Sequence, residues 1–275
     1  MDSKYSLDDI VISHQSESSI RPEPEIITTS LVEQSWQLFE NCRITQSMGV
    51  IQGPSGTGKS FAYKAILNRF TQAQLPGSLA IVPCCQASGP SSGVRGILRE
   101  LGLGGAVTTN NAGAGLQFLL KLAQREIIQR DIQGLLLDDA DNFAVDSLGG
   151  IVSLFNNLKE SGHPIVIMLA GVLPEDRWIG QLPSAVTRTL HVQRSTPMPL
   201  KMMAAVMKRM GNPLPAVIEA YQAGDKDAGK ILRMIHGQTG GVFRRVRFFA
   251  DLASEKSPGA LTLETTEAIL GQMQN

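Results

Sequence analysis

The sequence predicts an α/β fold, in which a parallel sheet is flanked by helices, followed by a small all-α lid. Short apolar runs alternate with helical patterns as far as residue 196, and only helical patterns follow. The first apolar run leads directly into the glycine-rich stretch 53–60. We therefore expect a flexible N-terminal arm over residues 1–25, an α/β core over 26–196 and the helical lid over 197–275.

The core is expected to begin with a helix that Thr28, Thr29 and Ser30 can cap. Apolar runs predict strands over residues 48–51, 78–83, 134–137, 164–170 and 190–192. Apolar residues at helical spacing predict helices over residues 61–70, 91–101, 116–130 and 145–158. The lid is predicted to contain helices over residues 200–210, 214–223, 228–236, 242–253 and 263–272.

The stretch 53–60 has the pattern G-x-x-x-x-G-K-S of a phosphate-binding loop, or P-loop. Its glycines let consecutive backbone N–H groups point at phosphate oxygens, beside a helix N-terminus that also favours an anion. Lys59 can reach the outer phosphates, and the Ser60 hydroxyl can ligate Mg²⁺. We predict that ATP with Mg²⁺ is bound here, by Gly53, Pro54, Ser55, Gly56, Thr57, Gly58, Lys59, Ser60 and Phe61.

A carboxylate at a neighbouring strand end is the second half of such a site. The apolar run 135–137 ends in Asp138, about 80 residues after the P-loop. We predict that Asp138, with Ser60, holds the magnesium ion. Asp139 then stands where the acid that activates the attacking water is expected. For Asp141 and Asn142 we prefer the role of a helix cap.

The amino-acid composition limits the other classes of function that this protein can have. Basic and acidic residues both total 25, so the strong positive charge that often marks a nucleic-acid binder is lacking. Any DNA contact would therefore need a local patch or many copies acting together. The three cysteines have no metal-ligand spacing, and we expect no metal site beyond Mg²⁺. No apolar run approaches the roughly 20 residues that span a bilayer, so we expect a cytoplasmic protein without membrane contact.

The order of P-loop, acidic strand end, further core strand and helical lid resembles that of an AAA+ ATPase. Within that superfamily the chain is similar to the bacterial and phage regulators of transposition, the family of the Mu B protein, TnsC and TniB. The similarity spans about residues 25 to 255. The segments that carry it are residues 25–36, 138–143, 168–171 and 240–245.

The resemblance implies an ATPase in which Lys59, Asp139 and two arginines have catalytic roles. Arg244 falls in the segment similar to the lid's sensor 2, G-x-x-R, where an arginine couples the γ-phosphate to the lid angle. Arg188 is the best candidate for the arginine finger that a neighbouring protomer supplies, with Arg177 behind it. Arg245 and Arg247 could serve a protomer interface or a solvated helix face.

Two residues depart from the family pattern. The family usually has Glu where this chain has Asp139, which is one methylene shorter. It also has a polar sensor 1 residue, where Val172 here follows the strand that ends at Gly171. Because a general base must lie within hydrogen-bond reach of its water, we expect slow hydrolysis that a partner stimulates.

The resemblance further implies a homo-oligomer, a filament or ring, that assembles on double-stranded DNA and recruits a DDE-type transposase, with or without a targeting factor. Contact would be made with phosphates and be nearly blind to sequence. Loops at residues 86–95, which include Arg95, and 108–111 are candidates, although ordinary surface loops are an equal alternative. Two other functions stay open: a helicase-loader or replication-initiator AAA+ protein, and a signalling or secretion-associated ATPase that binds no DNA.

Overall fold

The computed structural model describes residues 29–85, 89–103, 115–172, 190–211 and 213–273. Five strands form one parallel sheet in the order β2-β3-β4-β1-β5. They are β1 (Met48–Gln52), β2 (Ser78–Pro83), β3 (Ile132–Asp138), β4 (Val166–Gly171) and β5 (His191–Arg194). The predicted α/β fold is therefore confirmed, and all five predicted strands are present.

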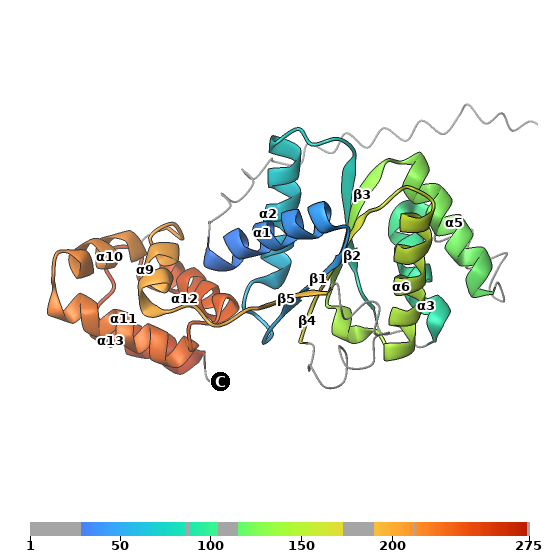
Figure 1. Cartoon of the computed structure of the whole chain (residues 1–275). Helices are drawn as coiled ribbons and strands as arrows, with labels where there is room; N and C mark the ends of the chain where they lie inside the picture. The colour runs from blue at the N-terminus through green and yellow to red at the C-terminus, as the bar shows by residue number, and fades with distance from the viewer. Residues whose placement is uncertain (1–28, 86–88, 104–114, 173–189, 212, 274–275) are drawn as a thin grey trace, which may run out of the picture.

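Helices cover both faces of the sheet (Figure 1). One face carries α1 (Ser30–Thr45) and α2 (Lys59–Gln72). The other face carries α3 (Pro90–Leu98), α5 (Leu116–Gln129) and α6 (Val145–Glu160). The helix predicted over residues 91–101 differs in detail, because after Leu98 the chain continues as a π-helical turn, η2 (Arg99–Leu103), that is broken at Gly102 with φ 80°. The predicted cap of α1 is correct, since the Thr29 side chain accepts a hydrogen bond from the Val32 backbone N–H at 3.2 Å.

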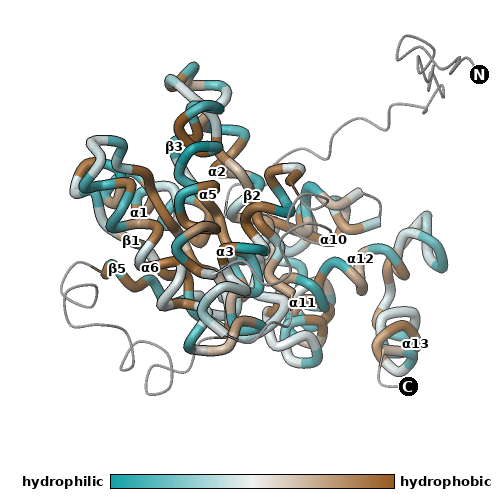
Figure 2. The backbone as a smooth tube through the Cα atoms, turned by 90° about the vertical axis from the view of Figure 1, so that its right-hand side faces the viewer, coloured by the Kyte–Doolittle hydropathy of each residue, from teal (hydrophilic) through white to brown (hydrophobic). Residues whose placement is uncertain are grey.

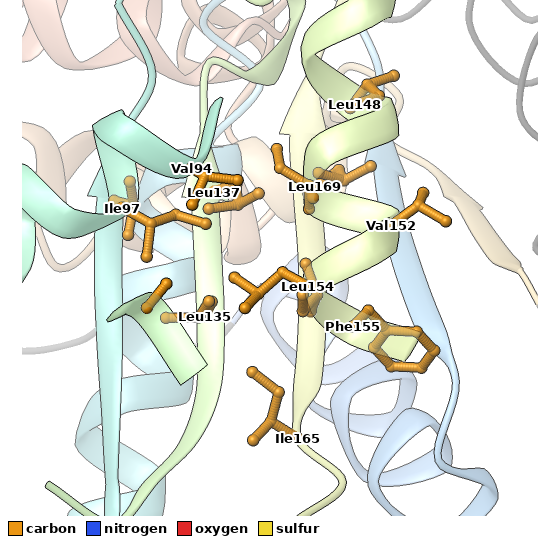
Figure 3. Close-up of a cluster of buried hydrophobic side chains, with 14 of the residues drawn as sticks. Val94, Ile97, Leu135, Leu137, Leu148, Val152, Leu154, Phe155, Ile165 and Leu169 are labelled. Carbon is orange, nitrogen blue, oxygen red and sulfur yellow. The ribbon is translucent and has the colours of Figure 1, made fainter. Parts of the chain in front are cut away.

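Each face of the sheet has its own hydrophobic core. The larger core lies between the sheet and α3, α5 and α6, where strand residues such as Leu135 and Leu169 meet helix residues such as Ile97 and Leu154 (Figure 3). The smaller core, under α1 and α2, is built around Phe39, which stacks on Trp36 and meets Phe70 edge-on. In Figure 2 hydrophobic stretches run through the middle of the molecule and hydrophilic ones through its outer turns.

The lid consists of α9 (Leu200–Met207), α10 (Leu214–Gln222), α11 (Lys226–Thr239), α12 (Phe243–Lys256) and α13 (Leu263–Gln272). These helices enclose a third core, which includes the fully buried Met203, Leu232, Ile235 and Phe249. β5 leads from the sheet toward this group of helices, which stands beside the α/β core (Figure 1). Within the described residues, no helix combines the length and the hydropathy that a bilayer crossing requires.

Close packing of α3 against α6 depends on small residues. A Cβ at Gly150 in α6 would lie 2.1 Å from the carbonyl oxygen of Pro90, and one at Gly93 in α3 would lie 2.8 Å from that of Ser147. Both distances are shorter than a van der Waals contact. The two glycines therefore let the helix backbones approach, and this approach also brings the Ser92 and Ser147 hydroxyls within 2.6 Å of each other.

We predict opposite effects of alanine at two adjacent glycines of α6. Gly150→Ala should destabilise the protein by about 1–3 kcal/mol, because its methyl group overlaps α3. Gly149→Ala should stabilise it by up to about 1 kcal/mol, because no atom lies within 4 Å of its Cβ and alanine favours the helix. Urea unfolding of both variants measures the difference. Equal effects at the two positions would contradict the described packing.

Candidate nucleotide-binding site

The P-loop is placed by the carboxyl end of β1, which lies between β4 and β5. The Gly53 backbone N–H donates to the Gly171 carbonyl at the end of β4, and the Ser195 N–H donates to the Gln52 carbonyl. A Cβ at Gly53 would lie 2.5 Å from the Ser195 carbonyl oxygen, so the chain passes here only with glycine. The three strand ends therefore fix where the loop begins.

Bonds within the P-loop give it a closed shape. The Lys59 ammonium donates to the carbonyls of Gly53 and Pro54 at 2.8 and 2.9 Å, and the Thr57 hydroxyl donates to the Pro54 carbonyl at 2.9 Å. Gly58, with φ 102°, precedes α2 without a capping side chain. Gly58 offers no side-chain oxygen to the first-turn amides of α2, which is the arrangement that suits an anion at a helix N-terminus.

Burial and neighbouring charges act in opposite directions on Lys59. Burial lowers the pKa of its ammonium group below the ordinary lysine value, and the carboxylates of Asp141, Asp139 and Asp138 raise it in part. The side chain is 6% exposed. A phosphate placed in the loop would favour the charged form of Lys59 in the same way as these carboxylates do.

Asp138 ends β3 beside the first turn of α2. Burial raises the pKa of its carboxyl group, and hydrogen bonds from the Ser60 side chain and the Asp139 backbone N–H oppose this effect. A hydroxyl and a carboxylate oxygen thus meet at one point, and oxygen donors of this kind are the ones that Mg²⁺ prefers. Asp138 and Ser60 therefore fit the magnesium site that the sequence predicts. Within the described residues, no group of three or more His, Cys, Asp or Glu side chains offers an alternative metal site.

A tight turn after β3 presents Asp139 to the P-loop. Asp139 adopts left-handed backbone angles, φ 51° and ψ 44°, which Asp and Asn tolerate better than most residues do. The 3₁₀-helical turn η3 (Ala140–Asn142) follows it. The side chain of Asp139 is exposed and lines the pocket above the P-loop, so it is open to a water molecule or a ligand there.

The helix-cap role preferred for Asp141 and Asn142 is wrong. Ala144, and not either of these residues, precedes α6. The Asp141 carboxylate instead accepts the Val172 backbone N–H at 3.0 Å, and the Asn142 side-chain amide donates to the Cys84 carbonyl at 2.9 Å. The two side chains bond to the segments that follow β4 and β2, so they tie the turn that carries Asp139 to both neighbouring strand ends. Val172 itself is 46% exposed at this edge.

The lid reaches the P-loop through the first turn of α12. The Arg244 backbone N–H donates to the Gly56 carbonyl at 3.0 Å, and its guanidinium Nη1 lies 3.5 Å from the Ser55 hydroxyl. A Cβ at Gly56 would lie 2.9 Å from a Val242 methyl group. Arg244 thus contacts the P-loop through both its backbone and its side chain.

A pocket of about 220 Å³ lies between the P-loop, the turn after β3 and α12. Phe61 of α2 and Phe243 of α12 both line it and stack on each other, with ring centres 5.5 Å apart. A smaller pocket adjoins this pair and is lined by Thr29, Pro197 and Met202 among others. The residues that line the larger pocket are Ser55, Gly56, Gly58, Lys59, Ser60, Phe61, Asp139, Phe243, Arg244 and Arg247.

The structure brings most predicted site residues together, and it adds others. Phe243 and Arg247 also line the pocket, and neither was predicted to do so. The available signal was that they lie one and three residues from Arg244 in the sequence. Arg188 and Arg177, the arginine-finger candidates, and the loop at 108–111 lie outside the described residues. In the proposed DNA-contact loop at 86–95, residues 86–88 also lie outside the described residues. Arg95 belongs to α3 and not to a loop, because that helix already begins at Pro90.

A family model matches part of the chain. Residues 42–178 match the model described as AAA domain. This stretch includes the P-loop and Asp138. A search of curated proteins finds no match to the sequence.

Solved structures of AAA+ proteins share the fold. The ORC2 protein of Aeropyrum pernix, solved with ADPNP and ADP, has a TM-score of 0.65 at 12% identity over 88% of this chain. Domain III of the Thermotoga maritima replication initiation protein DnaA has a TM-score of 0.57 at 12% identity over 90% of this chain and 93% of its own. The A. pernix ORC1 protein, solved in complex with DNA, has a TM-score of 0.58 at 12% identity over 92% of this chain. The chain spans 66% of the ORC2 chain and 68% of the ORC1 chain.

We predict that Asp141 stabilises the turn after β3 through its bond to Val172. Asp141→Ala removes the acceptor and should lower the free energy of unfolding by about 1 kcal/mol. Asp141→Asn retains an oxygen at the same position and should keep most of that stability. Thermal unfolding of the two variants provides the comparison, and an equal loss in both would show that the hydrogen bond is not the stabilising contact.

Proposed function

We propose that this protein is an ATP-dependent AAA+ switch, in which the bound nucleotide controls the lid and thereby the assembly of copies on double-stranded DNA. The observation that carries the proposal is the hydrogen bond from the Arg244 backbone to the Gly56 carbonyl. The lid is hydrogen-bonded to the loop that would hold the phosphates. A change in the conformation of that loop would therefore alter the position of α12. A lid without contact to the P-loop would have no such link.

Different residues of the pocket would carry out different parts of the reaction. The P-loop amides and Lys59 would hold the inner phosphates, and Ser60 and Asp138 would hold the magnesium ion, which neutralises charge that develops on the phosphate oxygens. Asp139 would orient a water molecule and accept its proton. Arg244 would contact the outer phosphate as sensor 2. The arginine finger would come from a second copy, with Arg188 as its first candidate.

The DNA part of the proposal is supported by likeness of fold. The neighbours include the DnaA domain and ORC proteins, of which one was solved in complex with DNA. We therefore favour a role of the replication-initiator or helicase-loader kind. With zero formal net charge, binding would rest on several copies that each contribute a few phosphate contacts, and it would weaken as salt concentration rises.

A regulator of transposition is the second candidate. The run Asp138-Asp-Ala-Asp-Asn-Phe143 and the segment before the P-loop favour it, because both are similar to the corresponding segments of that family. The two candidates share the site chemistry and differ in the client, which is a helicase in the first and a DDE-type transposase in the second. They also differ in the assembly expected on DNA.

We predict that the protein assembles on duplex DNA only with a bound triphosphate. Electron microscopy and sedimentation with a non-hydrolysable ATP analogue, Mg²⁺ and duplexes of several lengths should show complexes that ADP does not support. Lys59→Ala should abolish them, since it removes a phosphate ligand. Filaments that lengthen with the duplex would favour the transposition regulator, and short complexes of fixed size the initiator. Discrete rings that are indifferent to DNA would contradict both.

We also predict slow turnover that a longer acid accelerates. Asp139 is one methylene shorter than the glutamate usual at this position, so its carboxylate should hold the attacking water less well. Asp139→Glu should raise the turnover of ATP several-fold, and Asp139→Asn should lower it, with ATP affinity changed little in either variant. Steady-state phosphate release measures both. Rapid wild-type turnover that falls in Asp139→Glu would contradict the expectation.

A further inference from the structure

Arg247 lines the same pocket as Arg244, one helical turn farther along α12. Residues three apart lie on the same side of a helix, with a rise of about 4.5 Å between them. Arg245, which lies between them in the sequence, is exposed and does not line the pocket. The helix therefore presents two of its three neighbouring arginines to the nucleotide site.

The two pocket arginines differ in how they are held. Arg244 is fixed by its backbone bond to Gly56 and lies near the Ser55 hydroxyl. Among the ion pairs of the described residues, none includes Arg247. A guanidinium group that lines a pocket and has no carboxylate partner there is suited to an anionic ligand, because its planar fork matches phosphate oxygens.

Position along the pocket indicates which part of a nucleotide Arg247 meets. The aromatic pair Phe61 and Phe243 adjoins the smaller pocket, where neither Arg244 nor Arg247 is found. The larger pocket, which both arginines line, is also lined by the same aromatic pair and by Lys59 and Asp139. A flat base fits beside the aromatic pair, where the two pockets adjoin, and the arginines, which line the larger pocket alone, belong with Lys59 and Asp139 to the part in which the terminal phosphate and the attacking water would lie.

Charge supports the same assignment. Three cations, Lys59, Arg244 and Arg247, and the carboxylate Asp139 line this pocket. The carboxylates of Asp138 and Asp141 also act on Lys59 and offset part of its attraction for an anion. Arg247 therefore adds to the attraction for a phosphate, and its effect is greatest on the ligand with the most negative charge.

We propose that Arg247 is a specificity-determining residue that contacts the terminal phosphate together with Arg244, so that the site distinguishes a nucleoside triphosphate from a diphosphate. This inference rests on the proposed ATP site. Arg244 would couple the terminal phosphate to the position of the lid. Arg247 would determine how much more tightly the triphosphate binds than the diphosphate. In a protein whose assembly depends on bound triphosphate, this difference in affinity determines how completely hydrolysis of the terminal phosphate releases the lid.

Competition binding with a fluorescent ATP analogue tests the proposal, with ATPγS and ADP as competitors, in Mg²⁺ and at a protein concentration below assembly. Arg247→Gln should weaken ATPγS binding about tenfold or more, as expected for the loss of a charged hydrogen bond, and ADP binding less than twofold. Arg245→Gln is the matched control on the same helix and should change neither. Thermal unfolding checks that both variants are folded.

Other outcomes separate the inference from the proposed function. If Arg247→Gln leaves both affinities unchanged or lowers both equally, Arg247 does not read the terminal phosphate and the inference fails, while nucleotide binding stands. If the wild-type protein binds neither nucleotide, the proposed function itself fails.

Discussion

The contact between Gly56 of the P-loop and the first turn of α12 is the constraint on which the account depends. A hydrogen bond joins the two backbones, and there is no room for a side chain at Gly56, where φ is 81°. The lid has its own hydrophobic core, and it also meets the α/β core through the Phe61–Phe243 stack and the hydrogen bond from the Ser30 hydroxyl to the Met202 sulfur. The contact at Gly56 makes the lid part of the candidate nucleotide site, and it places Phe243, Arg244 and Arg247 around the pocket.

The opposite wall of the pocket depends on an equally specific arrangement. Asp139 stands in a left-handed turn, and the side chains of Asp141 and Asn142 tie that turn to the segments after β4 and β2. The end of β4 also supports the P-loop, because the Gly171 carbonyl accepts the Gly53 backbone N–H, so the acid that would act on water and the residues that would hold phosphate share part of their support. The bond from Asp141 ends at Val172, so the backbone N–H of this exposed residue is engaged.

The fold and the core of the site could be predicted from the sequence because they are local. Alternating apolar runs specify the strands, the G-x-x-x-x-G-K-S spacing specifies the P-loop, and an acid after an apolar run specifies Asp138. The contacts that could not be predicted join residues that lie far apart in the sequence. Gly56 meets α12 across nearly 190 residues, and the partners of Asp141 and Asn142 lie in segments that follow other strands. A cap was the reasonable expectation for two such residues before a helix, but the turn bends them toward the neighbouring strands.

The central claim, that nucleotide in the P-loop acts on the lid through α12, is tested most directly by amide hydrogen exchange. Exchange at residues 53–60 and 242–247 would be compared in the free protein, with Mg–ADP and with Mg²⁺ and a non-hydrolysable ATP analogue. The account predicts that the triphosphate protects both segments together, and that the diphosphate protects the P-loop but α12 much less. Protection of the P-loop by the triphosphate with unchanged exchange in α12 would contradict it.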